Sequence, residues 1–153
     1  MKDAAPQTIY LKDYTPPAYL VDSVHLTFRL SPEHTRVISR IEFRPNPDAQ
    51  SKEFSLHGEN LLLHWARIDG QEILPEQSLE GLTCAVPEGP FTWEAEVEIS
   101  PVSNTALEGL YISNGMYCTQ CEAEGFRKIT YYPDRPDVMS VFTVRIESDL
   151  PVL

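Results

Sequence analysis

Nine residues of unbroken alternation constrain the fold of this chain more than any other feature of its sequence. Every second position from 91 to 99 is apolar: Phe91, Trp93, Ala95, Val97 and Ile99. Three of the positions between them are glutamates. Because successive side chains of a β-strand point to opposite faces, this pattern predicts a strand with one face buried and the other in water.

Shorter runs of the same period occur along most of the chain. Val24, Leu26 and Phe28 alternate with polar residues, and a second alternating run covers residues 37–43. Turn-forming residues at 31–34 separate these runs, which together predict a hairpin. Asp69-Gly70 predicts another hairpin, between strands at 61–68 and 71–74. Further strands are expected at 54–56, 82–86 and 141–147, and a short helix only near 124–130.

Many short strands separated by proline-rich turns are typical of all-β chains, so we predict an antiparallel β-sandwich. The 153 residues suffice for one domain with a real core. Residues 1–19, which contain Pro6, Pro16 and Pro17, are expected to form an extended surface segment, and residues 20–153 the sandwich. Only a few residues follow the strong strand at 141–147, which predicts a sheet cut short at its C-terminal edge.

The formal net charge of −11 limits the possible partners. Nucleic-acid binding and attachment to an anionic membrane both need clustered Lys and Arg, so neither is expected. No apolar run approaches the roughly 20 residues of a transmembrane segment, and the first residues lack the apolar core of a signal peptide. Three cysteines, an odd number, fit reduced thiols. A cytoplasmic location is therefore expected.

Cys118 and Cys121 form a Cys-x-x-Cys pair, a spacing found in zinc knuckles and redox sites. A structural zinc site needs four ligands, and the chain offers no second pair. A thioredoxin-like site needs a βαβ context, which the predicted strands do not supply. Both thiols are therefore interpreted as structural, with a metal or redox role as the weaker alternative.

The histidines give no sign of a catalytic zinc site. His57 and His64 lie seven residues apart and are interpreted as surface or core histidines. The His-Glu-x-x-His motif of zinc peptidases is absent from the sequence, as is a phosphate-binding glycine loop. Taken alone, the residue patterns contain no catalytic apparatus.

Gln120, Glu122 and Glu124 occupy alternate positions around Cys121. If this segment is extended, their side chains project to one face. A carboxylate beside a carboxamide in a partly desolvated pocket can receive a primary ammonium group, which offers three hydrogen-bond donors. The alternative is a solvated acidic face, and the pattern alone favours that alternative.

Three segments of the same region carry a resemblance to a known family. They read Asn-Thr-Ala-Leu-Glu-Gly-Leu-Tyr at 104–111, Cys-Thr-Gln-Cys-Glu-Ala-Glu-Gly-Phe-Arg at 118–127 and Tyr-Tyr-Pro-Asp-Arg-Pro-Asp-Val at 131–138. Together they closely resemble the bacterial aminopeptidase N family of zinc-dependent alanyl aminopeptidases, which are gluzincins. The similarity is nearly gapless over residues 100–146, and a weaker similarity extends over almost the whole chain.

The resemblance implies that the chain is the N-terminal domain of such an enzyme. In the family this domain is a saddle-like β-sandwich that packs on a catalytic domain of the same polypeptide. The zinc helix and the Gly-x-Met-Glu-Asn loop of that catalytic domain do not occur in this sequence. Zinc is therefore expected in the full-length enzyme, with its ligands outside this chain, and the 153-residue chain alone is expected to be inactive. A free-standing β-sandwich binding module is the alternative function.

The family's Thr-Gln-x-Glu-Ala motif falls on residues 119–123. By position, the resemblance implies that Glu122 binds the free α-amino group of a peptide substrate and that Gln120 lines the pocket for its first side chain. Glu124, Arg127 and Asp134 are assigned to holding this loop or the domain interface. No catalytic group and no metal ligand is carried over.

Overall fold

The computed structural model describes residues 10–149 of the 153-residue chain. Its strands are β1 (Tyr19–Arg29), β2 (Thr35–Pro45), β3 (Ser55–His57), β4 (Leu62–Ile68), β5 (Gln71–Ile73), β6 (Glu76–Gln77), β7 (Gly81–Thr83), β8 (Phe91–Ile99), β9 (Gly109–Ser113), β10 (Met116–Gln120) and β11 (Val141–Glu147). The helical turns are the 3₁₀ segments η1 (Leu11–Asp13), η2 (Pro101–Ser103) and η3 (Phe126–Lys128). The predicted all-β fold is confirmed. No described helix is long and apolar enough to cross a membrane.

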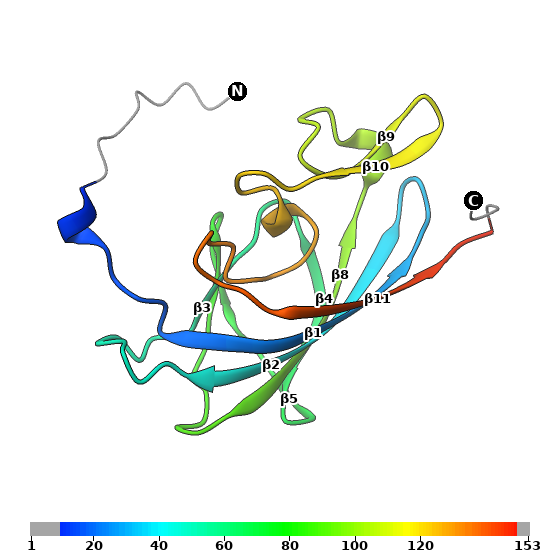
Figure 1. The fold of residues 1–153 in the computed structure, drawn as a ribbon. Helices are drawn as coiled ribbons and strands as arrows, with labels where there is room; N and C mark the ends of the chain where they lie inside the picture. Colours follow the sequence, from blue (N-terminus) through cyan, green and yellow to red (C-terminus); the bar gives the residue numbers. More distant parts are fainter. Residues whose placement is uncertain (1–9, 150–153) are drawn as a thin grey trace.

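A six-stranded sheet in the order β11-β1-β2-β8-β4-β5 is the largest layer (Figure 1). A three-stranded sheet, β3-β7-β6, and the β9-β10 hairpin complete the described strands. Neighbouring strands run antiparallel, except that β11 lies parallel to β1, with Ser23 opposite Val141 and Arg29 opposite Glu147. The parallel pair joins two segments that the intervening chain separates widely, so no local pattern predicts it.

Both predicted hairpins are confirmed. β1 and β2 pair from Tyr19 opposite Pro45 to Arg29 opposite Arg36. β4 and β5 pair with Ile68 opposite Gln71, and the two residues between them, Asp69 and Gly70, have φ angles of 49° and 78°. Two successive residues with positive φ match the twist of a tight hairpin, which explains the Asp-Gly sequence there.

The core lies between the large sheet and the elements that cover its inner face. The alternating apolar residues of β8 are all buried, as are their counterparts on β1 and β2. Phe54, which precedes β3, packs edge-on against Phe43 and Phe91 at ring-centroid distances of 5.0 and 5.2 Å. Leu56 of β3 and Leu82 of β7 belong to the same buried cluster. Residues from two sheets therefore share one core, as expected of a sandwich.

The outer face of the large sheet carries cross-strand charge pairs. Arg36 on β2 donates to Glu96 at 2.8 Å and lies 3.0 Å from Glu98 on β8. Arg44 on β2 pairs with Asp22 on β1 at 2.8 Å. The β8 glutamates thus point away from the core, as the alternation predicted, and their charges are partly compensated by neighbouring strands.

Some expected elements differ from the observed ones. The strand expected at 82–86 ends at Thr83, and the helix expected near 124–130 is only the single turn η3. The first nine positions of the expected surface segment at 1–19 lie outside the described residues. β11 is an edge strand of the described sheet, and six of its seven residues are exposed, including Phe142 and Val144.

Candidate functional site

The β9-β10 hairpin positions the first residue of the candidate site. Gln120 is the last residue of β10 and lies opposite Gly109, the first residue of β9. The turn between the strands is Asn114-Gly115, with φ angles of 48° and 78°. Asn-Gly is the strongest short-range hairpin signal, so these two residues were the clue to a hairpin that our sequence-based prediction missed.

The chain turns immediately after Gln120. Residues 122–125 form a turn, which the Gly125 amide closes by donating to the Cys121 carbonyl at 2.8 Å. The Glu122–Ala123 peptide bond is cis. Because β10 ends at Gln120 and residues 122–125 form a turn, the extended geometry considered for residues 120–124 is wrong, and Gln120, Glu122 and Glu124 do not share one strand face. What brings Gln120 to Glu122 instead is a hydrogen bond of 3.3 Å from the Gln120 amide Nε2 to the Glu122 carbonyl.

Gln120 and Glu122 are both exposed. Within residues 10–149 the Glu122 carboxylate has no hydrogen-bond or ion-pair partner. Most outward carboxylates of the large sheet differ in this respect, since Glu94, Glu96 and Glu98 are each paired with an arginine. The Glu122 carboxylate is therefore available to pair with a positively charged group outside residues 10–149.

Arg127 and Asp134 anchor the chain on the C-terminal side of this turn. The Arg127 backbone amide and Nε both donate to Asp134 Oδ2, at 3.1 and 3.0 Å. Arg127 Nη2 donates to the Asp134 carbonyl at 3.0 Å and lies 3.5 Å from the Glu124 carboxylate. The Arg127 and Asp134 side chains are each only 11% exposed. The structure therefore brings together the three residues that were assigned to holding the loop.

His57 meets this cluster too, although no pattern in the sequence connects it to residues 120–134. Its ring Nδ1 accepts a hydrogen bond of 3.1 Å from the Asp134 backbone amide. Burial lowers the pKa of His57, and the nearby Arg127 lowers it further, against smaller opposing effects of Asp134, Glu124 and the Tyr132 backbone. The ring is therefore held in its neutral form near pH 7.

Comparison with known proteins shows the family to which this chain belongs. The family model of the Peptidase M1 N-terminal domain matches residues 16–153. This chain belongs to that family. Aminopeptidase N of Caulobacter vibrioides is 44% identical to this M1 N-terminal domain over 152 residues, which are 97% of the chain and 18% of that protein. Aminopeptidase N of Escherichia coli K12 is 42% identical over 146 residues, 94% of the chain and 17% of that protein.

Solved structures agree with the sequence comparison. Legionella pneumophila aminopeptidase A, in complex with aspartic acid, superposes on this M1 N-terminal domain with a TM-score of 0.81 at 31% identity, covering 89% of this chain and 17% of that one. Native yeast LTA4 hydrolase shares the fold, with a TM-score of 0.70 at 23% identity over 89% of this chain and 24% of its own. The resemblance inferred from residues 104–138 is confirmed. The chain spans less than a fifth of the length of the aminopeptidase N relatives.

Gly125 is required by the close approach of the turn to the hairpin of this M1 N-terminal domain. A Cβ at this position would lie 2.4 Å from the Gln120 carbonyl oxygen and 3.1 Å from the Gly109 nitrogen. Both are backbone atoms of the β9-β10 hairpin, which positions Gln120. We expect Gly125→Ala to destabilise the domain by about 1–3 kcal/mol through overpacking, as measured by urea denaturation.

Gly89→Ala is the matched control for that substitution. No heavy atom lies within 4 Å of a Cβ built at Gly89. Its alanine variant should be neutral or more stable by up to about 1 kcal/mol, because alanine restricts the unfolded chain. Equal effects of the two substitutions would contradict the packing argument.

Cys118 and Cys121 of the M1 N-terminal domain were interpreted as structural thiols. Cys84, Cys118 and Cys121 are all free thiols. Burial, with a smaller effect of Asp134, raises the pKa of Cys121, so this thiol stays protonated near pH 7 and is a poor nucleophile. Within residues 10–149 no three His, Cys, Asp or Glu side chains are grouped so that they could hold a metal ion.

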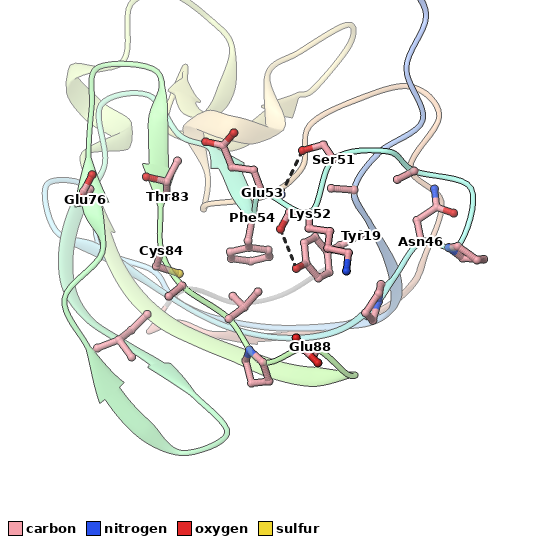
Figure 2. Close-up of a pocket in the computed structure, with 18 of the residues that line it drawn as sticks. Tyr19, Asn46, Ser51, Lys52, Glu53, Phe54, Glu76, Thr83, Cys84 and Glu88 are labelled. Atoms are coloured by element: carbon pink, nitrogen blue, oxygen red, sulfur yellow. Dashed lines mark hydrogen bonds between the residues drawn. The ribbon is translucent and has the colours of Figure 1, made fainter.

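A cavity of about 900 Å³ opens elsewhere on the M1 N-terminal domain, beside β1 and β7. Figure 2 shows the rings of Tyr19 and Phe54 and the thiol of Cys84 around it. Burial raises the pKa of Cys84 to about 11, so the thiol there is protonated and unreactive at neutral pH. Gln120 and Glu122 do not line this cavity, which separates it from the turn that the family motif marks.

Proposed function

We propose that this chain is the N-terminal part of a zinc-dependent aminopeptidase and that its Gln120–Glu122 turn recognises the free α-amino group of peptide substrates. Membership of the M1 N-terminal domain family and the aminopeptidase relatives support the reaction class. The observation that carries the role of the turn is the exposed Glu122 carboxylate, which has no partner among residues 10–149 although the turn itself is firmly anchored.

The donors and acceptors of such a complex match in number. A primary ammonium group has three N–H donors. Glu122 offers two carboxylate oxygens, and Gln120 offers its Oε1, since its Nε2 already donates to the Glu122 carbonyl. An ion pair of this kind strengthens when the surrounding site excludes water. An internal peptide bond has no ammonium group to offer, so this contact favours removal of one N-terminal residue at a time.

Among the described residues 10–149, no group of His, Cys, Asp or Glu side chains could hold a zinc ion. In the proposed enzyme the metal belongs to another part of the polypeptide, on which this domain packs. The 153-residue chain alone is then inactive, and its partners are peptides through their N-termini and the remainder of its own polypeptide. Three free cysteines support a reducing compartment, and we include the cytoplasm in the proposal.

The test uses the full-length enzyme with Glu122→Gln and Glu122→Ala. Each substitution removes the carboxylate that would pair with the substrate ammonium. We expect Glu122→Ala to lower kcat/KM on an alanyl chromogenic substrate by about 2–4 kcal/mol, roughly 30- to 1000-fold, with a raised KM. Glu122→Gln keeps the shape but not the charge, and should recover little of the loss.

Two controls accompany the measurement. Glu72→Gln changes an exposed glutamate of β5 and should leave the kinetics unchanged. The isolated 153-residue chain should hydrolyse nothing. Wild-type kinetics in both Glu122 variants would remove Glu122 from substrate recognition, and hydrolysis by the isolated chain would contradict the assignment of the catalytic machinery to another domain.

A further inference from the structure

We propose that His57 is a positioning residue for the substrate-recognition turn and that it acts through Asp134 and Arg127. This inference rests on the proposed role of Glu122 and deepens it. The residue comes from a different sheet and lies more than 60 positions before the turn, and the family motif does not include it.

A backbone bridge brings His57 to the site. The His57 amide donates to the Tyr132 carbonyl at 2.9 Å, and the Tyr132 amide donates to the His57 carbonyl at 3.1 Å. This two-way bridge fixes β3 against the segment that follows η3. It also places the His57 ring beside the next residues of that segment, where Nδ1 accepts from the Asp134 amide at 3.1 Å.

The direction of that hydrogen bond defines the state of the ring. A backbone amide can only donate, so Nδ1 must carry a lone pair and the proton of the neutral ring must be on Nε2. Protonation of Nδ1 would replace the acceptor with a second donor facing the Asp134 N–H. The hydrogen bond would then be lost, and a cation would appear beside Arg127.

Asp134 transmits the position of His57 to the turn. Its carboxylate accepts from the backbone amide and from Nε of Arg127, and its carbonyl accepts from Nη2. Arg127 in turn lies 3.5 Å from Glu124, inside the turn that carries Glu122. Every contact from His57 to Glu124 is thus a direct hydrogen bond or ion pair, in an environment where Arg127 and Asp134 are 11% exposed. Low exposure makes such a polar network sensitive to the loss of one member.

Charged groups from several elements surround His57. The charges that shift the pKa of the ring are those of Arg127, Asp134 and Glu124. Two surface pockets that His57 helps to line also contain Glu53, Arg135, Glu76 and Glu80. Burial and Arg127 dominate and lower the pKa of His57 below the usual value of about 6.5. As the pH falls, the unfolded chain therefore takes up this proton before the folded protein does. The contribution of His57 to stability is complete above about pH 6.5 and is lost as the pH falls through the lowered pKa.

Two substitutions separate a positioning role from simple space filling. His57→Asn retains an acceptor, since Asn Oδ1 stands close to the place of His Nδ1, and it cannot be protonated. His57→Leu retains bulk and removes the acceptor. Both are made in the full-length enzyme, and kcat and KM are measured from pH 5 to pH 8 on an alanyl chromogenic substrate.

We expect His57→Asn to keep kcat/KM at pH 7.5 within about threefold of wild type and to fall less steeply than wild type below about pH 6. His57→Leu should raise KM about tenfold at pH 7.5 with a smaller change in kcat, because the turn loses its alignment with the substrate ammonium. Combined with Glu122→Gln, His57→Leu should have little further effect, since both act on one contact.

Other outcomes overturn the inference. Equal losses of kcat/KM in the Asn and Leu variants would mean that His57 only supports the fold. The same conclusion would follow if His57→Leu lowered kcat/KM by the same factor in the Glu122→Gln variant as in the wild type. Unchanged kinetics of His57→Leu would exclude any role. If Glu122→Gln alone changes nothing, the proposed function fails; if Glu122→Gln is impaired but the His57 variants match wild type, only this inference fails.

Discussion

Replacing Trp93 with alanine is expected to lower the free energy of unfolding of this domain by about 3–5 kcal/mol. Trp93, the third residue of β8, is 0% exposed and lies between Ile41 of β2 and Ile68 of β4. Its ring centroid is 6.0 Å from that of Phe54, at the contact between the two sheets. Alanine would therefore leave a cavity at the centre of the sandwich. Urea denaturation at fixed pH measures the loss.

Two further variants test the cause of that loss. Trp93→Phe should cost distinctly less, because the indole N–H has no hydrogen-bond partner in the described part of the chain and most of the packing is kept. Leu74→Ala removes a side chain that is 97% exposed and should change the stability by no more than about 0.5 kcal/mol. A similar loss in Trp93→Ala and Leu74→Ala would contradict the assignment of the core.

Replacing Arg127 with methionine is expected to destabilise the domain by about 3 kcal/mol or more. Methionine keeps much of the side-chain volume but removes the guanidinium, which leaves the Asp134 carboxylate in a site where it is 11% exposed. Removing one member of a largely buried ion pair costs more than the pair itself contributes, because the remaining charge lacks compensation. The free energy of unfolding of Arg127→Met, again from urea denaturation, checks this value.

Arg29→Met is the matched control, because Arg29 pairs with Glu147 at 3.1 Å but the two side chains are 57% and 37% exposed. We expect a change of about 1 kcal/mol or less for this exposed pair. In the double variant Arg127→Met/Asp134→Leu, part of the stability should return, since neither charge remains. Equal effects at positions 29 and 127 would show that burial does not set the strength of the Arg127 pair.

The strands that the sequence predicts well are those whose burial pattern is set within the strand itself. In β8 each apolar residue faces the core and each glutamate faces outward, so the period of two is complete. The β9-β10 hairpin lacks this pattern: Tyr111, Ile112 and Tyr117 are all half-buried, and only the Asn114-Gly115 turn marks it. No local pattern predicts that β11 pairs with β1 either, because the two strands lie far apart in the sequence.

The candidate site is a clearer case of long-range determination. Gln120 and Glu122 were proposed as site residues from the family motif, and their alternation suggested an extended segment, whereas residues 122–125 form a turn. The turn depends on the absence of a side chain at Gly125, where the hairpin backbone passes within contact distance. His57 reaches the site only through its bridge to Tyr132. Gly125 belongs to the turn, but the hairpin strand β9 that it approaches and the His57–Tyr132 bridge lie outside the turn, so the residues of the turn alone could not show either relation.

The parallel pairing of β1 with β11 has a consequence for the order in which the domain can be assembled during synthesis. β1 forms its hairpin with β2 early, because the two strands are neighbours along the chain. Its other edge pairs with residues such as Glu147, 118 positions beyond Arg29. At ribosomal rates of about 5–20 residues per second, that edge stays unpaired for roughly ten seconds after β1 emerges. Until β11 is synthesised, this unpaired edge of β1 leaves the nascent domain open to aggregation.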